Sequence, residues 1–295
     1  MNKDILDKSL TKAFDKAING GVNGLTAMTG QVVGLMWMRT IMNYQYRHGG
    51  NFSSTFKLLY NDGGIRRFYR GVGFALMQAP LSRFGDTAMN IGMMEVLKDT
   101  DLSIASKTFV GSTGAALWRI GIMPIDTFKS SLQVNGKEGL TIINNKIKTN
   151  GIRSLYHGAL ASGSATLVGH FPWFFTYNYL QDKIPTIKKT TSVYDINGNY
   201  RDIDTDFYHT KNILRSGCIG FASSSISDIT SNSLRVIKIN RQTQANTVSY
   251  TDLVRNIIRK EGATGLFTRG LGTKIMTNGI QGMVFTILFD YLQNK

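Results

Sequence analysis

Single charged side chains stand inside long segments of this sequence that are otherwise almost uncharged. Arg119 and Asp228 each lie within such a segment, and Arg83 and Asp86 lie three residues apart in another. A charge at the centre of an apolar helix is costly unless it faces water, a ligand or an opposite charge, so these four residues are candidate solute contacts. Structural roles are the alternative. Arg119 and Asp228 would then pair between helices, and Arg83 would pair with Asp86 along one helix.

The candidate contacts carry both signs of charge. Arginine can hold a carboxylate or a phosphate, and aspartate can hold an amine. This mixture slightly favours an amino acid or another small zwitterion as the ligand, and Lys274 nearby keeps a nucleotide or a carboxylate as an alternative. His170, beside Phe171 and Trp173, fits a buried histidine better than a ligand contact.

No metal centre or catalytic site is expected from the histidine and cysteine positions. The four histidines are scattered through different expected elements, and Cys218 is the single cysteine, so an internal disulfide is excluded. No grouping of serine, histidine and aspartate is supported by placement. We therefore predict that the protein is not an enzyme, and we predict no catalytic residue, no metal and no cofactor.

The composition is basic, with 34 Lys and Arg against 19 Asp and Glu and a net charge of +15. Such a surplus favours nucleic acid, an anionic membrane or anionic solutes as partners. The segment from Ala17 to Met38 carries no charge, and the segment from Gly158 to Gln181 carries no ionisable group except His170. Each segment is also long enough to span a bilayer as a helix. The mean hydropathy of −0.10 fits helices with one lipid face and one polar face. A soluble basic helical protein that binds nucleic acid is the more remote alternative.

The elements that must position these side chains recur three times. A basic residue is followed by an amide four positions later in the pairs Arg39 and Asn43, Lys129 and Gln133, and Lys238 and Gln242. Five positions before these basic residues stand Gly34, Pro124 and Ser233. A turn glycine follows each basic residue after 32, 29 and 32 positions, at Gly71, Gly158 and Gly270. Fixed offsets in three copies predict one repeated two-helix unit.

Each unit is expected to contain a long helix, a short surface helix and a second long helix. Apolar residues at helical spacing, such as Phe52, Phe56 and Leu59, predict the surface helices. The segments 39–71, 129–158 and 238–270 carry 17 basic and 4 acidic residues, which marks the side that is not translocated or that faces anionic lipid. The predicted division is an N-terminal segment (1–12), repeats at 13–103, 104–187 and 212–295, and a polar loop at 188–211.

These residues resemble the mitochondrial carrier family from about Ala13 to Leu292. The hallmark P-x-[DE]-x-x-[KR] is complete at Pro124, Asp126 and Lys129, and the acidic position holds Met36 in the first repeat and Arg235 in the third. The turn motif is matched in part, as in Tyr69-Arg70-Gly71, Tyr156-His157-Gly158 and Arg269-Gly270. The resemblance implies an all-α membrane protein with six transmembrane helices, pseudo-threefold around a central cavity. It also implies a monomeric solute transporter of the mitochondrial inner membrane that works by alternating access.

The resemblance further implies two gates. The inner gate would contain Arg39, Asn43, Asp126, Lys129, Gln133, Arg235, Lys238 and Gln242, and the outer gate Tyr177, Asn178, Gln181, Phe289, Asp290 and Gln293. Asp126 would pair with Lys238, Lys129 would lack its partner, and Arg39 would face Arg235. Because two of the three acids are missing, we expect both gates to close weakly, which would favour uniport or leaky exchange.

The implied substrate contacts lie at matched depths in the long helices. They are Thr29, Gln78, Arg83, Asp86, Arg119, Thr166, Asp228, Thr277 and Asn278. A cardiolipin-like anionic lipid would bind at the repeat turns near Gly71, Gly158 and Gly270, and no nucleic acid is expected as a partner. The main rival interpretation is a membrane adaptor that keeps the carrier fold without transporting.

Overall fold

The computed structural model describes residues 21–97, 100, 104–186, 193–194, 200–201 and 205–281. The helices are α2 (Gly21–His48), α3 (Phe52–Asn61), α4 (Gly64–Phe68), α5 (Val72–Val96), α6 (Ile104–Gly121), α7 (Met123–Asn135), α8 (Glu138–Asn150), the 3-10 helix η1 (Ile152–Tyr156), α9 (Ala159–Lys183), α10 (Thr205–Thr243) and α11 (Tyr250–Thr268). Residues 271–281 are also helical. The strands β1 (Val193–Tyr194) and β2 (Tyr200–Arg201) pair antiparallel.

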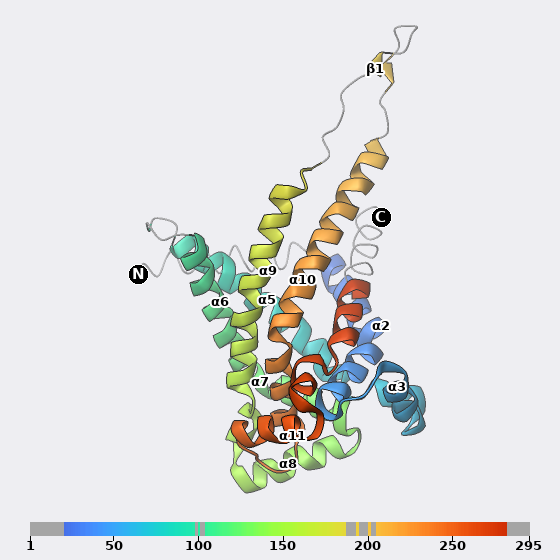
Figure 1. The fold of residues 1–295 in the computed structure, drawn as a ribbon, viewed down its shortest axis with the longest axis vertical. Helices are drawn as coiled ribbons and strands as arrows, with labels where there is room; N and C mark the ends of the chain where they lie inside the picture. Colours follow the sequence, from blue (N-terminus) through green and yellow to red (C-terminus); the bar gives the residue numbers. More distant parts are fainter. Residues whose placement is uncertain are drawn as a thin grey trace.

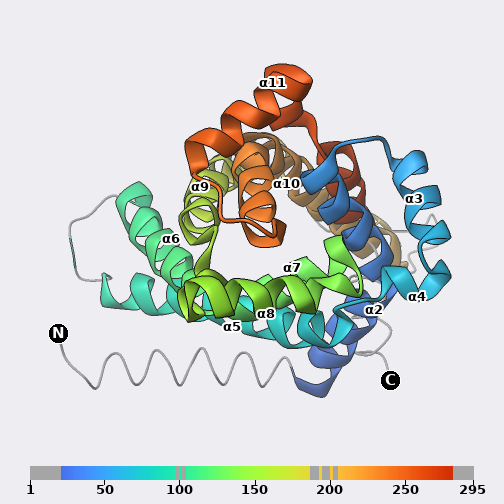
Figure 2. The same cartoon turned by 90° about the horizontal axis from the view of Figure 1, so that it is seen from below.

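The predicted helical repeat is present in the described residues. In each repeat a long first helix (α2, α6 with α7, and α10) leads into a short helix and a turn, and a second long helix follows. We call these three the first helices. The short helices α3, α8 and α11 all lie at one end of the molecule (Figure 1) and are spaced around it in the end-on view of Figure 2. The strand pair β1–β2 lies at the opposite end (Figure 1). Within the described part of the chain, no helix has both the length and the apolar character required of a candidate membrane span.

The proline of the second repeat interrupts its first helix as predicted. α6 ends at Gly121 and α7 begins at Met123, with Pro124 in the first turn of α7. Proline lacks an N–H and clashes with the preceding turn, which ends a helix at this point. In the other repeats α2 continues through Gly34 and α10 through Ser233, because glycine and serine keep the hydrogen-bond donor that proline lacks.

Apolar contacts hold the C-terminal ends of the first helices together with the surface helices. Leu253 and Ile257 of α11 are buried against α10 and α2 in a cluster that also contains Met42, Tyr46 and Val134. A second cluster joins Ile41 of α2 to Leu59 of α3 and Phe68 of α4. The amphipathic spacing read from the sequence therefore directs each surface helix onto the end of a first helix.

The turn glycines allow a close approach between neighbouring repeats. Gly71, Gly158 and Gly270 have positive φ values of 85°, 95° and 65°, which side chains rarely adopt. A Cβ atom at Gly71 would stand 3.1 Å from the carbonyl oxygen of Lys129. One at Gly158 would stand 3.0 Å from the carbonyl oxygen of Lys238. Each of these two turns therefore packs on the backbone of the next repeat at its predicted basic gate residue.

We expect Gly158→Ala to lower the free energy of unfolding by about 1–3 kcal/mol, because alanine resists the positive φ and its methyl group meets a backbone oxygen. The measurement is the melting temperature in detergent. Gly217→Ala is the matched control, since Gly217 is exposed in α10 with no atom within 4 Å of the added methyl group. Equal melting temperatures for the two variants would contradict the expected close approach.

One basic side chain of each repeat caps the C-terminal end of a first helix in the next repeat. The donors and the accepting carbonyl oxygens are Arg67 to Gln133 and Val134 at 2.8 Å each, Lys146 to Arg241 and Gln242 at 3.3 and 3.1 Å, and Arg269 to Arg47 at 3.1 Å. Arg67 also pairs with Asp62 at 2.5 Å, and Arg269 with Glu261 at 2.7 Å. Lys146 has no carboxylate within 4.0 Å among the described side chains. The three caps are therefore similar in position but not in charge balance.

Lys146 gives the second cap a dependence on pH. Burial, followed by the charges of Arg241 and Arg47, lowers the pKa of Lys146 from 10.5 to about 8. The unfolded chain therefore holds this proton between about pH 8 and pH 10.5 while the folded protein has released it, so stability rises with pH across that window. We expect the stability difference between wild type and Lys146→Met to grow by up to about 3 kcal/mol from pH 8 to pH 10.5. Melting temperatures of both proteins over this range test it, and a difference that stays constant or falls would contradict it.

The segment between the second and third repeats contains structure that the sequence did not indicate. α10 begins at Thr205, inside the predicted loop 188–211, and the strand pair also lies in that loop. Arg215 of α10 donates to the carbonyl oxygen of Gln181 at 3.1 Å, which ties α10 to the end of α9. Two-residue strands are too short to show an alternating pattern, so sequence analysis could not find them.

Candidate functional site

A cavity of about 400 Å³ lies between the helices and receives side chains from all three repeats. Most of the predicted substrate contacts line it: Gln78, Asp86, Arg119, Thr166, Thr277 and Asn278. The predicted inner-gate residues Arg39, Asn43, Asp126, Lys129, Gln133, Arg235 and Lys238 line it as well. The sequence repeat thus brings residues more than two hundred positions apart to one site.

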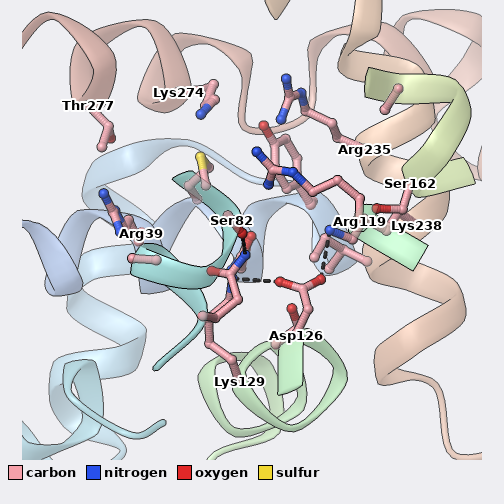
Figure 3. Close-up of a pocket in the computed structure, with 18 of the residues that line it drawn as sticks. Arg39, Ser82, Arg119, Asp126, Lys129, Ser162, Arg235, Lys238, Lys274 and Thr277 are labelled. Carbon is pink, nitrogen blue, oxygen red and sulfur yellow. Dashed lines mark hydrogen bonds and ion pairs between the residues drawn. The ribbon is translucent and has the colours of Figure 1, made fainter. Parts of the chain in front are cut away.

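Asp126 contacts three of the other predicted inner-gate residues. Its carboxylate accepts from Lys129 at 2.6 Å and from Lys238 at 2.7 Å, as Figure 3 shows, and from the Gln242 amide at 3.0 Å. The predicted pair with Lys238 is present. The expectation that Lys129 lacks a partner is wrong, because Lys129 shares Asp126 and also donates to Gln78 at 3.1 Å. One carboxylate therefore serves two repeats.

Amides replace the missing ion pair between the first and second repeats. Asn43 donates to the side-chain oxygen of Gln133 at 2.6 Å, and both residues are buried. Met36, in the acidic position of the family motif, is fully buried with its sulfur 3.5 Å from the Gln133 amide nitrogen. This boundary is closed by a neutral hydrogen bond and an apolar side chain.

The expected opposition of Arg39 and Arg235 is relieved by separate partners. Arg39 donates to the side-chain oxygen of Gln281 at 3.0 Å. Arg235 lies 3.5 Å from the carboxylate of Asp228. Asp228 also accepts a hydrogen bond from Asn278, so this aspartate is buried but satisfied.

Arg119 pairs across helices with a partner that the sequence did not indicate. Its guanidinium contacts both carboxylate oxygens of Asp86, at 2.5 and 3.3 Å, which joins α6 to α5. The pair of Arg119 with Asp228 that the sequence suggested is therefore wrong, because Arg119 bonds to Asp86 and Asp228 lies beside Arg235. The suggested pair of Arg83 with Asp86 stays a prediction, because the side chain of Arg83 lies outside the described residues. His170 also lines the cavity, with its Nδ1 atom 3.0 Å from the Ser112 hydroxyl.

The family model described as mitochondrial carrier protein matches residues 100–188 and 209–295. The chain belongs to the mitochondrial carrier family. The matched ranges correspond closely to the second and third predicted repeats of this carrier, and the contacts of Gly71 and Arg67 extend the same pattern to the first. Carriers of this family are transporters, which agrees with the prediction that the chain is not an enzyme.

Not every predicted contact of the carrier reaches the cavity. Thr29 is exposed and does not line it. The side chain of Arg83 lies outside the described residues, as do the outer-gate residues Phe289, Asp290 and Gln293. The other outer-gate residues are Tyr177, Asn178 and Gln181, and none of these lines the cavity. Gln181 donates to the Tyr177 hydroxyl within α9 at 3.0 Å. It also accepts from Arg215 at 2.8 Å, which connects α9 to α10.

Several polar residues of the carrier cavity were missed by sequence analysis. Gln31 donates to the carbonyl oxygen of Gln281 at 3.0 Å, and Gln78 donates to Ser82 at 2.7 Å. Ser82 lies four residues after Gln78, so the helical period could have found it. Gln281 carries no such signal, because its role depends on how its helix packs against α2.

Proposed function

We propose that this carrier moves a small metabolite across the mitochondrial inner membrane by alternating access, as a monomer. The observation that carries the proposal is the cavity, which receives polar side chains from all three repeats and is lined by Asp126 with its ion-pair partners Lys129 and Lys238. An amino acid or another zwitterion, a nucleotide and a carboxylate are the candidate substrates. Gln78, Thr166, Thr277 and Asn278 are the proposed neutral contacts.

The inner gate is held by few ionic contacts, which supports weak closure. Among the described gate residues Asp126 is the single carboxylate, while Asn43 and Gln133 contribute a neutral hydrogen bond. A gate of this kind costs less to open than one with three ion pairs, so uniport or leaky exchange is favoured. Liposomes that show strict counter-exchange alone would count against this interpretation.

Exposed apolar side chains support a location in lipid. Phe109 and Leu117 of α6, Phe171 and Phe175 of α9 and Phe221 of α10 are 44% to 65% exposed, and none of them lines the cavity. Soluble monomers rarely expose many large apolar groups together. The six-span topology and the anionic lipid at Gly71, Gly158 and Gly270 remain part of the proposal.

The proposal is tested by a ligand screen with the purified protein in detergent. A solute that binds the folded protein raises its melting temperature by mass action, so a substrate is expected to produce a concentration-dependent shift. Uptake of the same solute into liposomes containing the carrier then tests transport. The replaced acidic and proline positions of the first and third repeats favour the rival adaptor. If no amino acid, nucleotide, carboxylate or phosphate shifts the melting temperature or is taken up, the adaptor is favoured further.

A further inference from the structure

A second cavity, of about 470 Å³, lies at the end of the molecule that carries the short helices. We call it the end pocket. It is lined by the last residues of α2, by the end of α10, by α11 and by Arg269, which follows α11. Figure 2 shows α11 beside the ends of α10 and α2. No residue that lines the end pocket also lines the central cavity, so the two are separate sites.

Arg47, the next-to-last residue of α2, brings an unbalanced charge into the end pocket. Its guanidinium donates to the side-chain oxygen of Asn240 at 2.9 Å, and no carboxylate lies within 4.0 Å of it among the described side chains. Arg47 is only partly exposed. A charge that is partly removed from water is stabilised by an opposite charge, which the neutral Asn240 does not supply.

The carboxylate of the end pocket is already engaged. Glu261 accepts from Arg269 at 2.7 and 2.8 Å. It also packs against the turn after α2, because a Cβ atom at Gly49 would stand 2.8 Å from a Glu261 oxygen. Lys260 lines the pocket as well, and no carboxylate lies within 4.0 Å of its nitrogen among the described side chains. Within the part of the pocket that the structure describes, Arg47 and Lys260 are therefore two cations without an ion pair.

Neutral donors accompany these two cations. The side-chain amides of Gln244 and Asn256 line the pocket and make no hydrogen bond to another described residue. Leu253 and Ile257 form an apolar wall. The volume falls within the range of roughly 300–1,000 Å³ that is usual for small-molecule sites. The pocket therefore has room for an anionic group on the donors and for an organic part against the wall.

A phosphate group matches this set of donors better than a carboxylate does. A phosphate monoester carries about 1.5 to 2 negative charges at pH 7, which balances two cations, whereas a carboxylate carries one. Arginine binds phosphate oxygens through parallel hydrogen bonds, and lysine acts as a point charge for them. The further oxygens of the phosphate can accept from amides such as those of Gln244 and Asn256.

We propose that the end pocket binds a phosphate-bearing small molecule, with Arg47 and Lys260 on its phosphate group. This site is independent of the proposed transport function, since it shares no lining residue with the central cavity. The bound molecule would connect α2 of the first repeat to α11 of the third, beside the bond from Arg269 to the carbonyl oxygen of Arg47. A soluble phosphate ester and the phosphate of a lipid headgroup are the two sources of this chemistry.

The test measures the melting temperature of the purified protein in phosphate-free, low-chloride buffer. The soluble probes are glycerol 3-phosphate and ADP, with glycerol and adenosine as their phosphate-free counterparts. The lipid probe is phosphatidic acid in the detergent micelle, with diacylglycerol as its counterpart. We expect a concentration-dependent rise with at least one phosphate probe and none with its counterpart, and the probe that responds identifies the source. No response to any of the three phosphate probes would overturn the proposal.

Variants assign the binding to the end pocket. Lys260→Gln and Arg47→Gln are each expected to weaken the apparent affinity for the responding probe about tenfold, as the loss of one charge-assisted hydrogen bond predicts. Arg47→Lys should keep part of that affinity. Lys260 is exposed, so Lys260→Gln preserves the test if Arg47→Gln does not fold. Arg259→Gln removes an exposed charge from the neighbouring residue, outside the pocket, and should leave the affinity unchanged.

A variant of the central cavity separates this proposal from the transport function. Gln78→Ala alters the central cavity alone and should leave binding to the end pocket unchanged. Binding that Lys260→Gln leaves unaltered would overturn the assignment, and a loss of binding in Gln78→Ala instead would place the probe in the central cavity. Binding that depends on Lys260, in a protein that transports no solute, would support the end pocket while the proposed function fails.

Discussion

Replacing Asp126 with asparagine is expected to reduce transport at least a hundredfold and to destabilise the closed state strongly. The carboxylate is buried and satisfies Lys129, Lys238 and Gln242 at once, at 2.6 to 3.0 Å. Breaking a buried ion pair on one side leaves uncompensated charge and typically costs about 3–5 kcal/mol. Here two ammonium groups would be left facing each other. Uptake into liposomes and the melting temperature in detergent measure the two effects.

A matched control and a rescue make the effect of Asp126 specific. Asp182→Asn removes an exposed carboxylate at the end of α9 and should change neither readout. Adding Lys129→Gln and Lys238→Gln to Asp126→Asn removes the opposed charges and should recover part of the melting temperature, although not the transport. If Asp126→Asn behaves like Asp182→Asn, the inner gate is not held by this carboxylate.

The repeat and its elements could be predicted from the sequence because they depend on local signals. Spaced apolar residues place α3, α8 and α11, Pro124 interrupts the first helix of its repeat, and the turn glycines have the positive φ that their residue type favours. The pair of Asp126 with Lys238 followed from the family motif. These features need only the helical period or a residue type with one backbone preference.

The partners within the cavity could not be predicted in the same way. Arg119 had two acids within reach of its helix, and the packing of α6 against α5 selects Asp86. Lys129 pairs with Asp126, three residues away on its own helix, and a comparison of matched positions between repeats does not indicate such a pair. Side-chain pairing depends on rotamers and on how closely helices approach, and neither is encoded in spacing alone.

The asymmetry of the gate is continued in the caps beneath it. The second repeat supplies the carboxylate of the proposed gate, Asp126, and its first helix is the one interrupted by proline. The cap on the end of that helix, Arg67, is balanced by Asp62, whereas the cap on α10, Lys146, has no acid within 4.0 Å among the side chains that the structure describes. The helix that carries Asp126 in its first turn is thus held at its other end by an ion-paired arginine.

Arg67→Met is expected to be the most damaging change outside the cavity. Arg67 is 2% exposed and donates 2.8 Å hydrogen bonds to two carbonyl oxygens at the end of α7. Hydrogen bonds from a charged donor contribute about 1.5–3 kcal/mol each, so losing both should lower the free energy of unfolding by about 3–5 kcal/mol. Transport should also fall at least tenfold, since Asp126 lies on the helix that these bonds anchor.

The neighbouring residue provides the control for this prediction. Arg66 is exposed on the same short helix, so Arg66→Met removes the same charge and side-chain type without touching α7. We expect its melting temperature and its uptake into liposomes to match wild type. Arg67→Lys should recover only part of the loss, because one ammonium group cannot reproduce the fork that reaches two carbonyl groups and Asp62. Equal behaviour of Arg66→Met and Arg67→Met would mean that the cap does not hold the gate helix. The gate would then depend on the contacts inside the cavity alone.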